Sequence, residues 1–118
     1  MCHVLIIEDE ALIALNIQVV LMENGASSFD LAETEEEAIA AAIAHRPAVI
    51  TSDVRLRHGT GPNAVKAIHK QLGDIPVIFI TASPAACKPC EPPGVILIKP
   101  LDETAIATAF RMVMPEAA

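Results

Sequence analysis

Acidic side chains follow two apolar segments of the sequence. Glu8 and Asp9 follow His3–Ile7, and Asp53 follows Ala48–Ser52. A short run of β-prone residues bounded by turn signals predicts a buried strand. Like charges about 4 Å apart repel by roughly 4 kcal/mol at an effective dielectric near 20, so three converging carboxylates require a cation. Oxygen ligands with room for water favour Mg²⁺.

Two further polar residues extend this candidate site. Thr81 follows the apolar segment Pro76–Ile80, and Lys99 follows Val95–Ile98. A metal ion and a lysine beside a carboxylate neutralise a phosphoryl group, and an aspartate can be its covalent acceptor. Each residue taken alone is more often a turn residue or a helix cap. Their placement after four different strands favours a common phosphoryl site.

The elements that must position these residues alternate between strands and helices. Five strands are predicted at His3–Ile7, Ser27–Leu31, Ala48–Ser52, Pro76–Ile80 and Val95–Ile98. Helices are predicted at Ala11–Asn24, Glu35–His45, Gly61–Leu72 and from the N-cap Asp102 to Met114. Near-continuously apolar strands alternating with helices predict a three-layer α/β domain, in which helices cover both faces of a parallel sheet. Ligands of such sheets bind beyond the carboxyl ends of the strands.

Local signals mark the helix ends. Thr34 and Glu37 have the spacing of a capping box, and Pro62 is expected at the first position of its helix. Gly25 and Gly73 are expected to end the preceding helices.

The first helix carries two apolar stripes. One contains Ile13, Ile17, Val20 and Leu21, and the other contains Leu12, Leu15, Val19 and Met22. One of the two stripes is expected to cover the sheet. The other could pack under a loop or form the contact surface of a homodimer.

The segment Ser83–Gly94 has prolines at positions 84, 89, 92 and 93. Each interior proline costs a helix about 3 kcal/mol, so we expect an irregular fourth crossover. The segment contains Cys87-Lys88-Pro89-Cys90. A redox role needs this C-x-x-C motif at a helix start, and zinc needs two more ligands, so exposed thiols are the simpler interpretation.

Length and charge limit the remaining possibilities. The 118 residues suffice for one domain, residues 1–118, and the net charge of −7 disfavours direct nucleic-acid binding. The sequence has no apolar run of the roughly 18 residues that a membrane helix needs. We see no leader peptide, and three cysteines make no disulfide framework, so a cytoplasmic protein is expected.

The sequence resembles the receiver domain of two-component response regulators over essentially its whole length. Four segments carry the resemblance: Leu5-Ile6-Ile7-Glu8-Asp9-Glu10, Thr51-Ser52-Asp53-Val54-Arg55-Leu56, Phe79-Ile80-Thr81-Ala82 and Ile98-Lys99-Pro100. The resemblance implies a flavodoxin-like fold with a five-stranded parallel sheet in the order 2-1-3-4-5. It also implies a phosphorylation-dependent signalling switch, whose only chemistry is its own phosphorylation and dephosphorylation.

The resemblance assigns a role to each site residue. Asp53 would accept the phosphoryl group from a histidine kinase or a histidine phosphotransfer protein. Mg²⁺ would be held by Glu8, Asp9, Asp53 and the backbone carbonyl of Arg55. Thr81 would bind a phosphoryl oxygen. The Lys99 side chain would pair with the phosphate, and a cis peptide bond would follow this residue. An unidentified downstream protein would read the switch.

The sequence departs from the family pattern at several positions. Ile96 stands where the family often has an aromatic switch residue, and the proline-rich segment Ser83–Gly94 replaces the usual fourth helix. Phe79–Ala82 and the loop around Gly59-Thr60-Gly61 look like an atypical group of receivers in stress-response and phosphorelay proteins. We expect a stand-alone receiver of this kind rather than a fragment of a longer regulator.

Three other functions compete with the switch. A metal-dependent phosphatase of this topology needs Asp-x-Asp after the first strand, where this chain has Glu8-Asp9-Glu10. A flavodoxin-like cofactor binder needs a Ser-, Thr- and Gly-rich first loop, because an acidic loop repels phosphate. A receiver-like scaffold that is never phosphorylated remains the main alternative.

Overall fold

A computed structural model describes residues 2–82 and 94–115 of the chain. The described elements, in order, are β1 (His3–Ile7), α1 (Ala11–Glu23), β2 (Ser28–Ala32), α2 (Glu35–Ala44), β3 (Val49–Ser52), α3 (Gly61–Leu72), β4 (Val77–Thr81), β5 (Gly94–Ile98) and α4 (Glu103–Val113). The strands form one parallel sheet in the order β2-β1-β3-β4-β5. This arrangement confirms the predicted α/β class and strand order.

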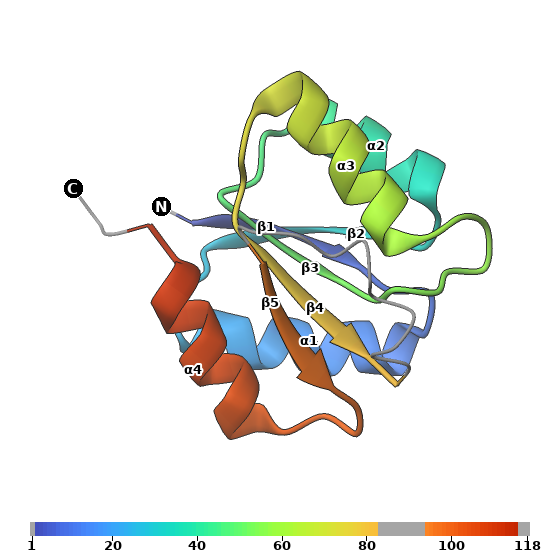
Figure 1. Cartoon of the computed structure of the whole chain (residues 1–118). Helices are drawn as coiled ribbons and strands as arrows, with labels where there is room; N and C mark the ends of the chain where they lie inside the picture. Colours follow the sequence, from blue (N-terminus) through green and yellow to red (C-terminus); the bar gives the residue numbers. More distant parts are fainter. Residues whose placement is uncertain (1, 83–93, 116–118) are drawn as a thin grey trace.

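Helices cover both faces of the sheet. In Figure 1, α2 and α3 lie on one side and α1 and α4 on the other. Side chains of a strand alternate between the faces. On β1, Val4 and Ile6 pack with α1 and α4, whereas Leu5 and Ile7 pack with α2 and α3. The sheet therefore separates two apolar cores and fixes the positions of the strand ends between them.

The predicted helix caps are largely confirmed. Thr34 Oγ1 accepts a hydrogen bond from Glu37 N at 3.1 Å, although the Glu37 carboxylate accepts from the backbone N–H of Glu33 instead of returning to Thr34. Asp102 Oδ1 accepts from the second and third residues of α4, at 3.0 and 3.2 Å. Gly25 has a φ of 114°, a conformation that favours glycine after a helix end.

The predicted position of Pro62 is wrong by one residue. Thr60 is the N-cap of α3, because its hydroxyl accepts a hydrogen bond from Asn63 N at 3.2 Å. Gly61 is therefore the first helical residue and Pro62 the second. Proline is tolerated there, since the first N–H groups of a helix have no partner within it.

Most strand bounds differ by one residue from the prediction. The second strand begins at Ser28 rather than Ser27. The backbone N–H and the side-chain hydroxyl of Ser27 both donate to the carbonyl of Cys2, at 2.8 and 3.0 Å. These bonds hold Ser27 as the link into the strand. The bounds of the first strand and the types of all predicted elements agree with the structure.

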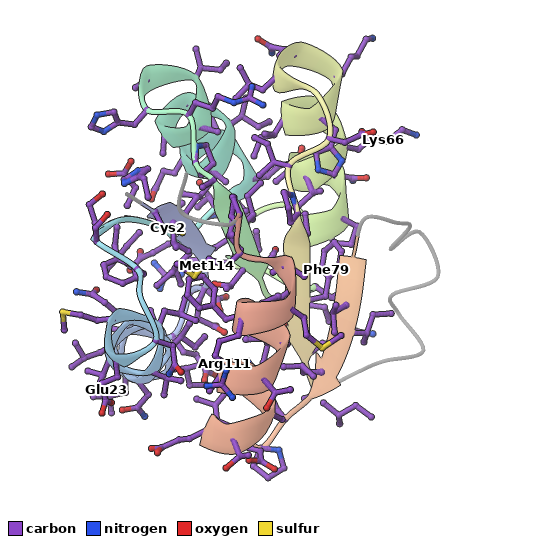
Figure 2. All side chains as sticks on the ribbon, turned by 90° about the vertical axis from the view of Figure 1, so that its left-hand side faces the viewer. Cys2, Glu23, Lys66, Phe79, Arg111 and Met114 are labelled. Atoms are coloured by element: carbon purple, nitrogen blue, oxygen red, sulfur yellow. The ribbon has the colours of Figure 1, made fainter. Side chains whose placement is uncertain are left out.

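The two stripes of α1 differ in exposure as expected. Ile17, Val20 and Leu21 are buried against the sheet and α4. The second stripe remains on the surface of the described part of the chain, with Leu12 77% exposed. The C-terminal end of α1 is tied to α4, because Arg111 Nη1 donates to Asn24 Oδ1 at 2.6 Å. Figure 2 shows Arg111 between these two helices.

Two sequence predictions concern residues outside the described ranges. They are the irregular fourth crossover at 83–93 and the C-x-x-C motif of Cys87 and Cys90, and both stay predictions. Within the described ranges, every helix is too short or too polar to cross a membrane.

Candidate functional site

The predicted site residues meet at the carboxyl edge of the sheet. Glu8 and Asp9 follow β1, Asp53 follows β3, Thr81 ends β4 and Lys99 follows β5. A cavity of about 290 Å³ opens there, lined by Asp9, Glu10, Asp53, Arg55, Thr81, Ala82 and Lys99. Glu8 is buried nearby, and its side chain is 1% exposed.

Lys99 links the acids of two strands. Its Nζ lies 3.0 Å from Asp53 Oδ2 and 3.1 Å from Glu8 Oε1. Burial alone would lower the pKa of Lys99, but the hydrogen bond to Asp53 and the charge of Glu8 outweigh burial and raise the pKa above its usual value. The ammonium is therefore charged and faces both carboxylates. The peptide bond between Lys99 and Pro100 is cis, as the resemblance implied.

Asp53 is held at both carboxylate oxygens. Its Oδ1 accepts a hydrogen bond from Val54 N at 2.7 Å, and its Oδ2 accepts from Lys99 Nζ. The backbone N–H of Asp53 donates to the Ile7 carbonyl at 2.9 Å, which joins the end of β3 to the end of β1. The side chain is 12% exposed and lines the cavity. Asp53 is thus both oriented and accessible.

Glu8 has an unusual environment for a carboxylate. Its Oε2 accepts a hydrogen bond from Glu10 N at 3.2 Å. Its Oε1 is buried and, among the described residues, has no hydrogen bond of acceptable geometry, although Lys99 Nζ is close. Burial, together with the negative charge of Asp53, raises the pKa of Glu8 to about 7. The group therefore needs either a proton or more positive charge.

The acidic residues fit a divalent cation. One carboxylate oxygen from each of Glu8, Asp9 and Asp53 lies within 4.8 Å of the other two. The buried Glu8 Oε1 is a hard oxygen ligand that contacts the Lys99 ammonium at 3.1 Å but accepts no hydrogen bond of good geometry from the described residues. Arg55, predicted to contribute its carbonyl, lines the same cavity. This donor set is typical of Mg²⁺.

Thr81 and Ile96 lie on adjacent strands near the site. Thr81 is buried and lines the cavity, and its carbonyl accepts a hydrogen bond from Lys99 N at 2.9 Å. Ile96 is 45% exposed and pairs in register with Phe79. An aliphatic side chain thus occupies the strand position where the family often has an aromatic one.

Sequence reasoning missed the role of Gly61. A Cβ atom on this residue would lie 1.8 Å from the carbonyl oxygen of Asp53 and 2.2 Å from Ser52 Oγ. Only glycine allows the start of α3 to approach the acceptor strand this closely. In the sequence, a glycine directly after Thr60 only weakly indicates this close approach, since glycine is common in loops.

The sequence indicates Glu35 only as part of a helix start, but in the structure Glu35 also holds the β3–α3 loop (residues 53–60). Its Oε1 accepts a hydrogen bond from Thr60 N at 3.1 Å, and its backbone N–H donates to the His58 carbonyl at 3.1 Å. Gly59, with a φ of 82°, packs so closely that an added Cβ would lie 2.5 Å from Glu35. The segment after Asp53 is therefore attached to α2.

Comparisons with known proteins agree with this geometry. A family model described as "Response regulator receiver domain" matches residues 4–111. The Phyllosphere-induced regulator PhyR of Methylorubrum extorquens is 39% identical over 84 residues, which cover 70% of this chain and 31% of that protein. The chain thus spans less than a third of this curated relative.

Solved structures show the same fold. The receiver domain of PhyR from Erythrobacter litoralis matches with a TM-score of 0.85 and 29% identity, over 99% of this chain and 96% of that one. PhyR from Bartonella quintana, described as an anti-anti-sigma factor, matches with a TM-score of 0.81 and 30% identity, over 95% of this chain and 48% of that one. Since the family model also covers most of the sequence, this chain belongs to the response regulator receiver domain family.

Proposed function

We propose that the chain is a phosphorylation-dependent signalling switch that accepts a phosphoryl group on Asp53. The observation that carries this proposal is the placement of Lys99 Nζ between Asp53 Oδ2 and Glu8 Oε1, at 3.0 and 3.1 Å, in an accessible cavity. Membership of the receiver family supports a histidine kinase or a histidine phosphotransfer protein as the donor.

The chemistry of the acceptor follows from its fixed orientation. An oxygen of Asp53 forms a bond to phosphorus, the bond from phosphorus to the donor imidazole breaks, and the imidazole nitrogen keeps the electron pair. The product carries about −1.5 to −2 charges in place of −1. The Lys99 ammonium is already within contact distance and offsets part of this added charge.

Glu8, Asp9, Asp53 and the backbone carbonyl of Arg55 are the proposed Mg²⁺ ligands. Bound Mg²⁺ would supply the positive charge that neutralises these carboxylates and the phosphoryl oxygens. The burial of Glu8 Oε1 without a well-aligned hydrogen bond from the described residues supports this assignment.

Thr81 is the proposed responder to phosphorylation. Its hydroxyl can donate to a phosphoryl oxygen from the cavity wall, and its carbonyl is hydrogen-bonded to Lys99 N. A change at Thr81 therefore reaches the end of β5 through the backbone. With Ile96 in place of an aromatic residue, coupled ring rotation is not part of the proposed switch.

The proposed chemistry is limited to phosphorylation of Asp53 and hydrolysis of the resulting aspartyl phosphate, without a further substrate. A cytoplasmic location and a protein as downstream target complete the proposal. Direct nucleic-acid binding by this chain is not proposed, because its net charge is −7. A receiver-like scaffold without phosphorylation is the alternative that the following experiment can reveal.

The test is a ¹⁵N–¹H NMR titration with Mg²⁺ and then with beryllofluoride, which mimics a phosphoryl group. Mg²⁺ should shift the amides of Asp9, Asp53 and Arg55, and beryllofluoride should then shift Thr81 and Ala82. Asp53→Ala should abolish the beryllofluoride shifts. Asp74→Asn changes an exposed acid outside the cavity and should respond as the wild type does. A folded wild type without either response would leave only the scaffold function.

A further inference from the structure

Two histidines and an aspartate converge at the opposite end of the sheet from the phosphoryl site. His3 begins β1, Asp30 lies in β2, and His45 is the C-cap of α2. His3 Nε2 lies 2.9 Å and His45 Nδ1 lies 3.9 Å from Asp30 Oδ2. One potential ligand atom from each residue lies within 4.8 Å of the other two. Along β1, His3 lies five residues before Glu8, a separation of roughly 16 Å.

The parallel register of β1 and β2 brings the cluster together. His3 pairs with Ser28, and Leu5 pairs with Asp30. Leu5 packs in the core under α2 and α3, so by alternation His3 lies on the same face. The end of α2 above this face brings in His45, whose ring centroid is 4.9 Å from that of His3.

We propose that His3, Asp30 and His45 form a binding site for Zn²⁺. Two imidazole nitrogens and one carboxylate oxygen are a donor set typical of zinc, whereas Mg²⁺ prefers oxygen ligands alone. Ligand atoms around a tetrahedral Zn²⁺ are about 3.3 Å apart. The distances of 2.9 and 3.9 Å to Asp30 Oδ2 bracket this value. Water takes the open position.

Ser28 supplies an outer contact that metal-binding histidines usually have. Its Oγ lies 2.7 Å from His3 Nδ1. Without a metal, His3 Nε2 donates to Asp30 Oδ2 at 2.9 Å, because a carboxylate only accepts. Metal binding would require the other tautomer, in which Nδ1 carries the proton and donates to Ser28 while the Nε2 lone pair faces the metal. Ser28 is therefore a positioning residue for His3 in this site.

The electrostatic surroundings also favour a cation. The site lies at the C-terminal end of α2, where the helix dipole is negative. Arg46 follows His45, but its guanidinium donates to the carbonyl of Leu72 rather than pairing with Asp30. The side chains of Asp30 and His45 are 36% and 76% exposed, so an ion reaches them from solvent.

The test is calorimetric titration of the full untagged chain with Zn²⁺. Cys87 and Cys90 are replaced by serine, and excess Mg²⁺ is present to occupy the carboxylates near Asp53. We expect one equivalent of Zn²⁺ to bind and to shift the imidazole ¹⁵N signals of His3 and His45. His45→Gln should weaken binding by at least roughly tenfold, the lower limit for losing even an outer contact of a metal ligand.

Two further variants test whether zinc binds at this cluster and whether Ser28 positions His3. His58→Gln, at an exposed loop histidine, should leave zinc affinity within about twofold, whereas Ser28→Ala should weaken it by roughly tenfold. Absence of zinc binding by the wild type, or equal binding by wild type, His3→Gln and His45→Gln, would overturn the proposal. The cluster would then be a histidine–aspartate hydrogen bond only. Binding with unchanged affinity in Ser28→Ala would overturn the positioning role of Ser28.

Discussion

Among the acids of the phosphoryl site, Glu8 is the one whose negative charge is least compensated by solvent and by positive charge. Lys99 brings one positive charge to a cavity edge that contains the carboxylates of Glu8, Asp9 and Asp53. Glu8 is also the most buried of the three acids, so it bears most of the desolvation cost of ionisation. Without a bound cation, the raised pKa of Glu8 is the physical result.

In the metal-free protein, Glu8 should make folding stability depend on pH. Its pKa of about 7 in the folded state lies above the ordinary value of 4.5. The folded state therefore retains a proton that the unfolded state releases, and the stability that Glu8 contributes is full below about pH 4.5 and lost as pH rises through about 7. In EDTA, the Tm of the wild type should fall relative to Glu8→Gln from about pH 5 to about pH 7.5.

Circular dichroism melts at a series of pH values measure this difference. Glu23→Gln, at an exposed position near the end of α1, is the matched control and should follow the wild type. Parallel Tm curves for the wild type and Glu8→Gln would show that Glu8 is ionised throughout this range.

The common location of the strand-end residues could be predicted, because the end of each strand can be recognised in the sequence. Asp53, Thr81 and Lys99 each follow an apolar run, and a parallel sheet must bring such ends to one edge. The His3, Asp30 and His45 cluster could not be found in this way. Its members are 27 and 15 residues apart, and only the strand register and the position of α2 bring them together.

Among the elements, the β3–α3 loop is a tightly constrained connection beside the site. Gly61 N donates to the Val54 carbonyl at 2.8 Å, and Arg55 pairs with Thr60 in an antiparallel bridge. These contacts join the two ends of the loop to each other before α3 begins. The sequence indicated a glycine-containing loop there, but it could not indicate that backbone atoms approach one another so closely.

Gly61→Ala should destabilise the fold and disturb the acceptor. The added methyl group would overlap the backbone of Asp53, which cannot rotate away. Overpacking of this kind costs about 1–3 kcal/mol, which urea unfolding followed by circular dichroism measures. The amide of Asp53 should also lose its response to Mg²⁺ and beryllofluoride.

Asn63→Ala is the control for this change, because residue 63 is exposed in the same turn of α3. It should leave both stability and the Asp53 response close to those of the wild type. A Gly61→Ala variant as stable as the wild type would contradict the close approach of α3 to β3.

In the molecule as a whole, one sheet lies between two separate apolar cores and contributes side chains to both. Ile68 of α3 is fully buried on one side, and Ile106 of α4 is 1% exposed on the other. Both cores include side chains of β1, β3 and β4. Because the same strands support both cores, neither core can be lost without the other.

Ile68→Val and Ile106→Val should therefore each cost about 0.5–1.5 kcal/mol within a single cooperative unfolding transition. Their effects should add to within roughly 0.5 kcal/mol in the double variant, since the sheet separates the two sites. The chain has no Trp or Tyr, so circular dichroism and methyl NMR are the suitable probes. Transitions that differ between probes, or a larger coupling energy, would indicate that the cores unfold separately or contact one another.

The attachment of the β3–α3 loop to Glu35 has a consequence for chemical control of the protein. Thr34, Glu35, His58 and Gly59 line an open hollow between this loop and α2. Among the described residues, none lines both this hollow and the phosphoryl cavity. A small molecule bound there would contact Glu35 and the loop residues that Glu35 holds, and this loop leads directly to Gly61, which packs against Asp53. An inhibitor could thus act on the acceptor without competing with phosphate for its highly polar site.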